Sequence, residues 1–372
     1  MIIGIPKEIK LQEHRIGLTP DSVKVLTDKG HEVLVQNNAG FEAGFGNENY
    51  KNVGAKIIEK AEEIFKEAEL IVKVKEPQTE EVNMIRENQI IYTYLHLAAA
   101  KELTKGLIKS KSICIAYETV TDDSGRLPLL APMSAVAGRM SIQAGAHSLE
   151  KNQKGRGLLL GGAPGVEPAN VVILGGGVVG ENAAIIATGM RGKVYVVDKS
   201  KERLKQLHEM FGDKIIPRES NKTDLKKLVS ECDLLIGGVL IPGAEAPKLV
   251  TKEMVKNMKR GSVVVDVAID QGGCVETSKP TTHANPTYLV DNVVHYCVAN
   301  MPGGVPRTST MALNKATLPL LIKLADQGYK KTLIDNKNYL AGLNVFRGKI
   351  TCKGVAEALK LEYTPAERAL LE

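Results

Sequence analysis

The segment VVILGGGVVGENAA, residues 171–184, constrains the fold more than any other part of the chain. An apolar strand-like run leads into Gly175, Gly177 and Gly180, and a helix-forming stretch follows. In such a turn the first glycine permits the tight bend and the second lets a pyrophosphate approach the backbone. The third lets the helix pack closely on the strand, which places phosphates at the helix N-terminus. The motif therefore predicts a strand–turn–helix unit that binds a dinucleotide.

The next apolar run, KVYVVD, supports this reading because it ends in Asp198. A carboxylate at about 20 residues beyond the glycines binds the ribose hydroxyls of the adenosine half. It also repels a 2′-phosphate, so NAD is expected rather than NADP. Lys199, Lys201 and Arg203 follow closely, which leaves some tolerance of NADP open.

The glycine motif lies in mid-chain, and 372 residues exceed what one hydrophobic core usually supports. Short apolar runs already alternate with amphipathic stretches over the first 118 residues, a pattern typical of a parallel sheet covered by helices. In LTPDSVKVLTDKG, Thr19 suits a helix N-cap, Pro20 the first turn and Gly30 the stop. A second alternating series follows the glycine motif. The fold class expected is α/β, with two doubly wound Rossmann-like domains.

Two long helical patterns, at 133–152 and after Pro306, are expected to connect these domains. Beyond them the tail to Glu372 shows short helical pieces and no good strand, so it is expected to pack on the first domain. The predicted substrate domain is thus discontinuous, covering residues 1–133 and 307–372. The NAD-binding domain is inserted as residues 134–306.

Composition narrows the class of protein. The chain is 43% hydrophobic and 25% charged, and its net charge of +6 is spread over lysines interleaved with glutamates. This favours solvated helix faces, so no nucleic-acid partner is expected. The five cysteines are scattered without a CxxC pair, which argues against zinc and against a disulfide framework. No apolar run reaches the ~18 residues of a membrane span, and the start does not read as a signal peptide. A cytoplasmic protein without a membrane partner is expected.

Ionisable groups recur where the strands of the first domain are expected to end. Arg15 follows the first strand, Lys73 and Lys75 share one face of LIVKVKEP, His96 follows IIYTYL, and Glu118 follows SICIAY. Each residue taken singly is more often an exposed loop charge or a structural histidine than part of a site. Together they predict an anion site with an acid/base, since ligands bind beyond the carboxyl ends of such strands and these groups suit a carboxylate and proton transfer.

The second domain offers Asp266 and Asp270 in SVVVDVAIDQGG. A glycine pair after Asp270 allows the backbone to approach a ligand closely. Asp270 is therefore expected to face the substrate side of a cleft, and Asp266 to be structural.

Several blocks in order resemble the alanine dehydrogenase family: GIPKEIK, EHRIGLTP, KVKEP, LHLAAA, AYETV, LPLLAPMSAVAGR, PGVEPA, VDVAIDQGGC and CVANMPGGVPRTST. The resemblance covers residues 1–345 and weakens in the tail. It implies that Arg15 holds a substrate carboxylate and that Lys75 binds near the carbonyl or carboxylate. His96 would be the acid/base, Asp270 would orient the nitrogen or a water, and Tyr94 and Met133 would line the substrate pocket.

The resemblance also implies a set of cofactor contacts. Ser134 and the residues of the glycine turn would contact the pyrophosphate, with Asp198 on the ribose. The full set expected is Ser134, Gly175, Gly177, Val178, Val179, Gly180, Asp198, Arg203, Ser220, Val239, Leu240, Val267, Ala268, Ile269, Asp270, Val298, Asn300 and Met301.

The activity implied is reversible NAD-dependent oxidative deamination of L-alanine to pyruvate and ammonium, by a homo-oligomer that is a hexamer in the family. Some members carry a metal on the long helix after residue 310. The matching positions here hold Lys323 and Gln327, poor magnesium ligands, so no metal is expected.

Three alternatives remain open. One is the NAD-binding hydride-transfer subunit of a proton-translocating transhydrogenase, which the family resembles in fold. Another is a related oxidoreductase acting on saccharopine or lysine. The third is a non-enzymatic protein that binds NAD without turnover.

Overall fold

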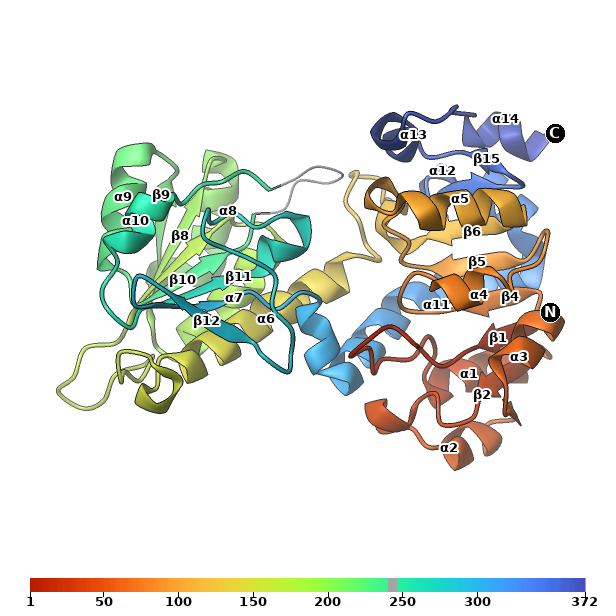
Figure 1. The fold of residues 1–372 in the computed structure, drawn as a ribbon, viewed down its shortest axis with the longest axis horizontal. Helices are drawn as coiled ribbons and strands as arrows, with labels where there is room; N and C mark the ends of the chain where they lie inside the picture. The colour runs from red at the N-terminus through yellow and green to blue at the C-terminus, as the bar shows by residue number, and fades with distance from the viewer. Residues whose placement is uncertain (240–245, 372) are drawn as a thin grey trace. The chain divides into compact units, whose positions relative to one another are not determined.

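The computed structural model describes residues 1–239 and 246–371. The chain divides into two compact units: Met1–Pro132 with Val305–Glu372, called unit 1, and Met133–Gly304, called unit 2. In each, helices flank one large sheet (Figure 1). The α/β class with two Rossmann-like units is thus confirmed.

The sheet of unit 1 has eight strands in the order β15-β14-β6-β5-β4-β1-β2-β3. All neighbours from β3 to β6 pair in parallel, whereas β14 pairs antiparallel with both β6 and β15. The elements of its first segment are β1 (Ile2–Ile5), α1 (Pro20–Asp28), β2 (Glu32–Gln36), η1 (Phe41–Ala43), α2 (Asn47–Lys51), β3 (Lys56–Ile58), α3 (Ala61–Glu67), β4 (Leu70–Val72), α4 (Thr79–Val82), β5 (Ile90–Thr93), η2 (Leu97–Ala99), α5 (Lys101–Ser110), β6 (Ile113–Ala116) and η3 (Tyr117–Thr119). Those of its second segment are α11 (Pro306–Ile334), α12 (Lys337–Leu340), β14 (Leu343–Phe346), β15 (Lys349–Ile350), α13 (Lys353–Leu359) and α14 (Ala366–Leu371).

The sheet of unit 2 has seven strands in the order β12-β13-β11-β10-β7-β8-β9, with only β12 antiparallel. The helix α6 (Ala131–Ser148) begins at the boundary between the units. The other elements are η4 (Lys151–Gln153), β7 (Asn170–Leu174), α7 (Val178–Gly189), β8 (Lys193–Asp198), α8 (Lys201–Phe211), η5 (Gly212–Lys214), β9 (Ile215–Glu219), α9 (Lys222–Glu231), β10 (Leu234–Gly237), α10 (Lys252–Lys256), β11 (Val263–Asp266), η6 (Val267–Gln271), β12 (Thr287–Val290), β13 (Val293–Tyr296) and η7 (Met301–Gly304).

Local sequence signals explain how several elements begin and end. The Thr19 hydroxyl accepts a hydrogen bond from the Ser22 N–H at 3.3 Å, and Pro20 occupies the first turn of α1. Gly30 follows the helix with φ +83°, a conformation that glycine adopts without strain. The N-cap, first-turn proline and stop predicted for this helix are therefore confirmed.

The tail corrects one expectation. It was expected to contain no good strand, but LNVFRGKI forms the hairpin β14–β15, and β14 continues the sheet beside β6. The strands are very short, and the turn uses positive φ at Arg347 and Gly348. The segment LNVF contains the polar Asn344 and so does not read as an apolar strand. Its place in the sheet is set by its pairing with the edge of β6. The tail does pack on unit 1, as expected.

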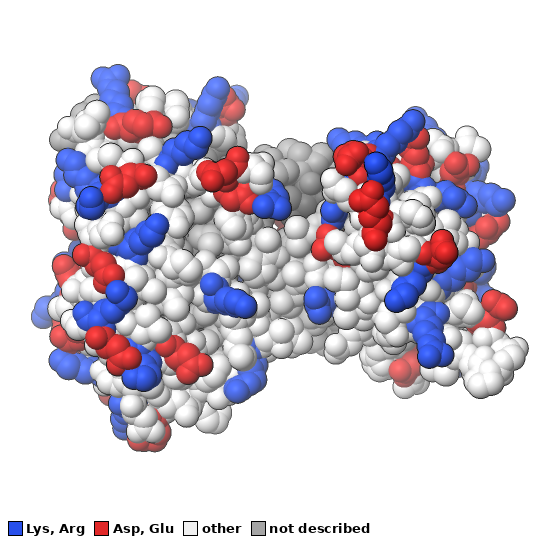
Figure 2. Space-filling model, turned by 180° about the vertical axis from the view of Figure 1, so that it is seen from behind, with Lys and Arg blue, Asp and Glu red and all other residues white. Residues whose placement is uncertain are grey.

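Charges of both signs are interspersed over the face of the molecule shown in Figure 2. Within the described ranges, no helix is both long and apolar enough to cross a membrane.

Candidate functional site

The strand order of unit 1 brings the loops after β1 and β4 to one place. These strands are neighbours, and the chain winds outward from them in opposite directions, through β2 and β3 on one side and β5 and β6 on the other. In such sheets, ligands bind beyond the carboxyl ends of the strands where the winding reverses. Arg15 lies in the loop after β1, and Lys75 follows β4.

Arg15 is held by a neighbouring carboxylate. Its Nε and Nη2 donate to the two carboxylate oxygens of Glu13 at 2.6 and 2.5 Å, and both residues are buried. Burial alone would lower the pKa of the Arg15 guanidinium, but the Glu13 contacts and the nearby Tyr94 and Glu8 raise it. The guanidinium is therefore a fixed positive charge in a set orientation, which suits recognition of a carboxylate.

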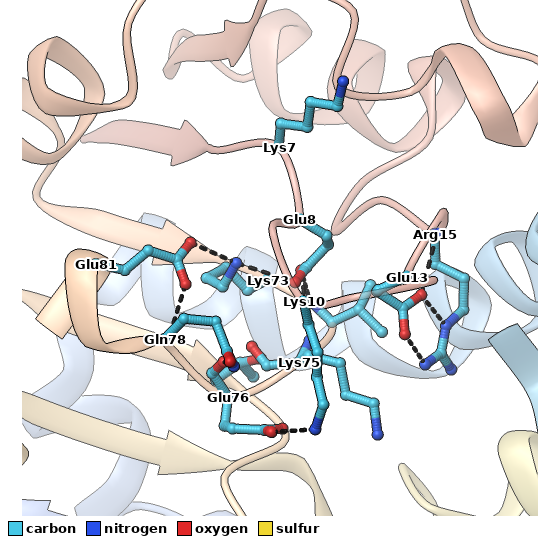
Figure 3. A network of polar contacts seen from close by, with 12 residues as sticks. Lys7, Glu8, Lys10, Glu13, Arg15, Lys73, Lys75, Glu76, Gln78 and Glu81 are labelled. Atoms are coloured by element: carbon cyan, nitrogen blue, oxygen red, sulfur yellow. Dashed lines mark hydrogen bonds and ion pairs between the residues drawn. The ribbon is translucent and has the colours of Figure 1, made fainter. Parts of the chain in front are cut away.

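The two lysines that were expected on one face have different surroundings. The Lys73 side chain is completely buried, with Nζ at 3.0 Å from Glu8 Oε2 and 2.7 Å from Glu81 Oε1. Burial would lower the pKa of Lys73, yet the two carboxylates raise it. Lys75 is partly exposed and its side chain extends away from this cluster (Figure 3). Lys75 is thus the lysine accessible to a ligand.

His96 follows β5 in an unusual backbone conformation. It has φ +51° and ψ +40°, a left-handed conformation that is uncommon outside glycine. One carboxylate holds it there: Glu118 Oε1 accepts hydrogen bonds from the backbone N–H of Leu95 at 3.1 Å and of His96 at 2.6 Å. The imidazole is half-exposed, and its Nδ1 lies 4.0 Å from Glu118 Oε1.

The Tyr94 ring packs against the imidazole of His96. The two rings stack with centroids 5.8 Å apart and an interplanar angle of 7°. The Tyr94 hydroxyl donates to the Leu129 carbonyl at 2.6 Å, and burial raises the pKa of this phenol far above its usual value. Tyr94 is therefore a wall and a stacking surface for His96 rather than a proton donor.

In unit 2, the glycine turn has the geometry that the motif predicts. Gly175 has φ +92°, and a Cβ placed on Gly180 would lie 1.8 Å from the Gly175 carbonyl oxygen. A Cβ on Gly177, by contrast, would meet no protein atom within 4 Å. The first and third glycines are thus required by the chain itself, whereas the space in front of Gly177, at the N-terminus of α7, fits a phosphate.

Asp198 ends β8 beside this turn. Its Oδ2 accepts from the Gly176 N–H at 2.7 Å and its Oδ1 from the Ser200 N–H at 2.8 Å. The Ser220 N–H donates to the Asp198 carbonyl at 2.9 Å. Arg203 donates from Nε to the Gly176 carbonyl at 2.6 Å and also pairs with Glu181. The structure therefore gathers the glycine turn, Asp198, Arg203 and Ser220 in one place.

A second cluster of unit 2 surrounds η6. Asp270 is exposed, and its carboxylate oxygens accept from the Asn300 N–H at 3.2 and 3.3 Å. Asn300 itself has φ +60°. Asp266 is buried and accepts from the backbone N–H of Cys274 and Val275, which is a structural role.

The remaining expected contacts are mainly apolar. Val178 is 43% exposed at the start of α7. Val239 adjoins the glycine turn, because a Cβ on Gly175 would lie 3.1 Å from its Cγ2. Ser134 and Val267 are partly buried, and Leu240 lies outside the described residues. The others are buried side chains: Met133, Val179, Ala268, Ile269, Val298 and Met301.

Lys323 and Gln327 are exposed on α11, where the Lys323 Nζ lies 5.0 Å from the centroid of the Tyr339 ring. The described part of the chain contains no group of three His, Cys, Asp or Glu side chains suited to a metal ion. The absence of a bound metal remains a prediction.

Three carboxylates support the residues predicted to act on substrate: Glu8, Glu13 and Glu118. Only Glu118 was indicated beforehand, by its place at a strand end. Glu13 carries a weak signal, since an acidic residue two positions before Arg15 can fold back on it. Glu8 carries none, because its partners Lys73 and Val74 lie more than 60 residues away.

Comparison with known proteins shows the family to which the chain belongs. Residues 4–137 match the family model described as alanine dehydrogenase/PNT, N-terminal domain, and residues 141–353 match the corresponding C-terminal domain. The chain is 57% identical to an alanine dehydrogenase of Halomonas elongata, covering 98% of this chain and 99% of the relative. It is 53% identical to an alanine dehydrogenase of Methanococcus maripaludis over the full length of both.

Solved structures give the same picture. An L-alanine dehydrogenase superimposes with a TM-score of 0.94 at 49% identity, covering 97% of this chain and 99% of that one. A transhydrogenase from Sinorhizobium meliloti superimposes with a TM-score of 0.83 at 22% identity, covering 94% of this chain and all of that one, which shows a shared fold. With both family models matched and full-length relatives above half identity, the chain belongs to the alanine dehydrogenase/PNT family.

Proposed function

We propose that this protein is an L-alanine dehydrogenase that converts L-alanine, NAD⁺ and water reversibly to pyruvate, ammonium and NADH. Membership of the family supports the proposal. The observation that carries it is the placement of Arg15, Lys75 and His96 at the carboxyl ends of neighbouring strands of unit 1.

Arg15 and Lys75 would bind the three-carbon acid. The guanidinium held by Glu13 is oriented for the substrate carboxylate, and the ammonium group of Lys75 would bind the carboxylate or polarise the carbonyl. Two cationic contacts to so small a substrate restrict the orientation of its α-carbon, which lowers the entropic cost of reaction. Tyr94, and Met133 at the start of α6, would form apolar walls.

His96 would move protons. An imidazole can both donate and accept a proton, so His96 can donate to the carbonyl oxygen during amination and accept a proton during the reverse reaction. The stacking on Tyr94 and the backbone contacts to Glu118 hold the ring in one place. Asp270 would orient the nitrogen or water through its carboxylate, which is itself held by Asn300.

NAD would supply the hydride acceptor. The open space at Gly177 fits the pyrophosphate, and Asp198 beside it suits the adenosine ribose. Arg203 is engaged by Gly176 and Glu181, so it is poorly placed to counter a 2′-phosphate, and NAD is preferred over NADP. A homohexameric assembly and a cytoplasmic location remain predictions from the sequence and the family resemblance.

The decisive test is a steady-state assay with pyruvate, ammonium and NADH, repeated with each component omitted. We expect NADH oxidation that requires pyruvate and ammonium together. Oxidation without ammonium would instead indicate simple reduction of a keto acid. Hydride exchange between nucleotides, with no response to pyruvate, would indicate transhydrogenase chemistry.

A further inference from the structure

We propose that Glu8 is a positioning residue for the substrate site, because its buried carboxylate fixes the backbone that carries Lys75 to the loop that carries Arg15. This inference rests on the proposed function. It concerns the Glu8 cluster, defined as Glu8, Lys73 and Glu81, whose members are joined by ion pairs and lie next to the backbone of Lys75 (Figure 3).

Glu8 accepts hydrogen bonds from the chain beyond β4, where the backbone of β1 no longer pairs with it. β1 pairs in parallel with β4 at Ile3 and Leu70 and at Gly4 and Ile71, but β1 ends at Ile5 and Pro6 follows. The chain beyond β4 therefore has no β1 backbone beside it. The Glu8 Oε1 atom takes that place, accepting from the N–H of Val74 at 2.6 Å and of Lys75 at 3.4 Å.

Hydrogen bonds from neighbouring strands hold residues 73–75 on the other side. The Lys73 N–H donates to the Tyr92 carbonyl at 3.1 Å, the Tyr117 hydroxyl donates to the Lys73 carbonyl at 3.0 Å, and the Thr93 hydroxyl donates to the Lys75 carbonyl at 3.0 Å. These contacts all come from the β5–β6 side of the sheet. Glu8 is the carboxylate of the loop after β1 that accepts hydrogen bonds from the backbone of Val74 and Lys75.

That loop also carries Arg15. Glu8 lies seven positions before Arg15 in the sequence, and a further ion pair between Lys10 and Glu76 joins the same two segments. The charge of Glu8 is one of the causes that raise the pKa of Arg15, after the larger contribution of Glu13. The spacing between the guanidinium of Arg15 and the amine of Lys75 thus depends on where Glu8 fixes the loop.

Glu81 offers a matched control within the cluster. It binds the same Lys73 Nζ and is equally buried, but its other oxygen accepts from the Gln78 N–H at 2.7 Å and not from the Lys75 segment. In either Glu8→Gln or Glu81→Gln, Lys73 stays paired with the one remaining carboxylate. Neither variant therefore leaves a buried charge without an ionic partner. The two variants make the same change of charge, and only Glu8→Gln disturbs Val74 and Lys75.

A glutamine at position 8 cannot satisfy both partners. If its oxygen faces Val74, its amide nitrogen faces the Lys73 ammonium, and if it flips, the amide nitrogen faces the backbone N–H groups. In both arrangements the amide NH2 group, a hydrogen-bond donor, faces another donor and one hydrogen bond is lost. Glu8→Asp gives a second variant that keeps the charge but is shorter by one methylene, so it cannot reach Lys73 and the Val74 N–H together.

The experiment is a kinetic comparison of the wild type, Glu8→Gln, Glu8→Asp and Glu81→Gln, with unfolding temperature and NADH affinity measured alongside. We expect KM for pyruvate to rise about tenfold in both Glu8 variants, about 1.4 kcal/mol of binding. We expect kcat to fall less than twofold and NADH affinity to be unchanged. Glu81→Gln should keep the wild-type KM even if its unfolding temperature falls equally.

Equal KM values for Glu8→Gln and Glu81→Gln in an active enzyme would overturn the positioning role and leave the proposed function standing. A wild type without ammonium-dependent turnover would overturn both. If Glu8→Gln does not fold, the Glu8→Asp comparison decides, since a wild-type KM in that variant would sink the inference.

Discussion

At the scale of single residues, His96 is the group on which turnover is expected to depend most. Positioned general acid–base catalysts contribute about 10²–10⁴-fold. Replacing His96 by Ala should therefore reduce turnover by at least about 10²-fold. NADH binding should be nearly intact, because the glycine turn and Asp198 belong to unit 2. Steady-state kinetics and titration of NADH fluorescence measure the two effects separately.

The control for this substitution is His147→Ala, an exposed histidine on α6 whose imidazole is 61% exposed. It should leave turnover and NADH affinity at their wild-type values. Turnover retained in the His96 variant would remove His96 from the role of acid/base.

Individual residues also show where sequence reasoning stops. Lys73 and Lys75 share a strand face in the sequence, and nothing in the local pattern separates a buried ion pair from an accessible amine. Lys73 differs from Lys75 because β1 ends at Ile5 and the chain beyond it places Glu8 next to the Lys73 amine. Such a contact joins segments more than 60 residues apart, and no short-range pattern encodes it.

At the scale of elements, the β7–turn–α7 unit was predictable because its constraints are local. Gly175 adopts a positive φ, Gly180 lies against the Gly175 carbonyl oxygen, and Gly177 faces open space at the N-terminus of α7. The roles differ, however, and substitution separates them. Gly177→Ala should fold with a nearly unchanged unfolding temperature, since its Cβ meets open space and φ is −68°. It should weaken NADH binding by about tenfold or more, because the methyl group occupies the space proposed for the pyrophosphate.

Gly180→Ala should show the opposite pattern. Its Cβ would overlap the Gly175 carbonyl oxygen, and relieving that contact is expected to cost about 1–3 kcal/mol of stability. Gly189→Ala, at the end of the same helix and with no atom within 4 Å of its Cβ, serves as the control and should affect neither property adversely. Thermal unfolding and NADH titration of the three variants provide the test. A Gly177 variant that binds NADH normally would contradict the proposed position of the pyrophosphate.

Other elements were not predictable from their own residues. The long alternating segments give strands and helices correctly, since buried parallel strands read as apolar runs bounded by turns. β14 is interrupted by the polar Asn344 and β15 has only two residues, so neither reads as a buried apolar strand. β14 is placed by its pairing with the edge of β6. Through these two strands, the tail forms part of the unit 1 sheet.

At the scale of the whole molecule, the last residues of the chain are expected to support the site formed by the first 118. α13 packs against η2, the short helix that begins immediately after His96. Val355 and Ala356 of α13 are buried in the same core cluster as Leu97 of η2 and Leu107 of α5. A chain that lacks α13 should therefore lose the support of the turn that presents His96.

Val355→Ala tests this dependence without removing the helix. Loss of two buried methyl groups is expected to cost roughly 2 kcal/mol of stability. Because the cavity would open beneath η2, we expect a lower kcat as well as a lower unfolding temperature, with NADH affinity unchanged. The matched control is Glu357→Ala on the same helix, where the side chain is 67% exposed and neither property should change. A Val355 variant with the wild-type kcat would mean that η2 holds His96 in place without α13. In that case the tail would contribute only to the stability of unit 1.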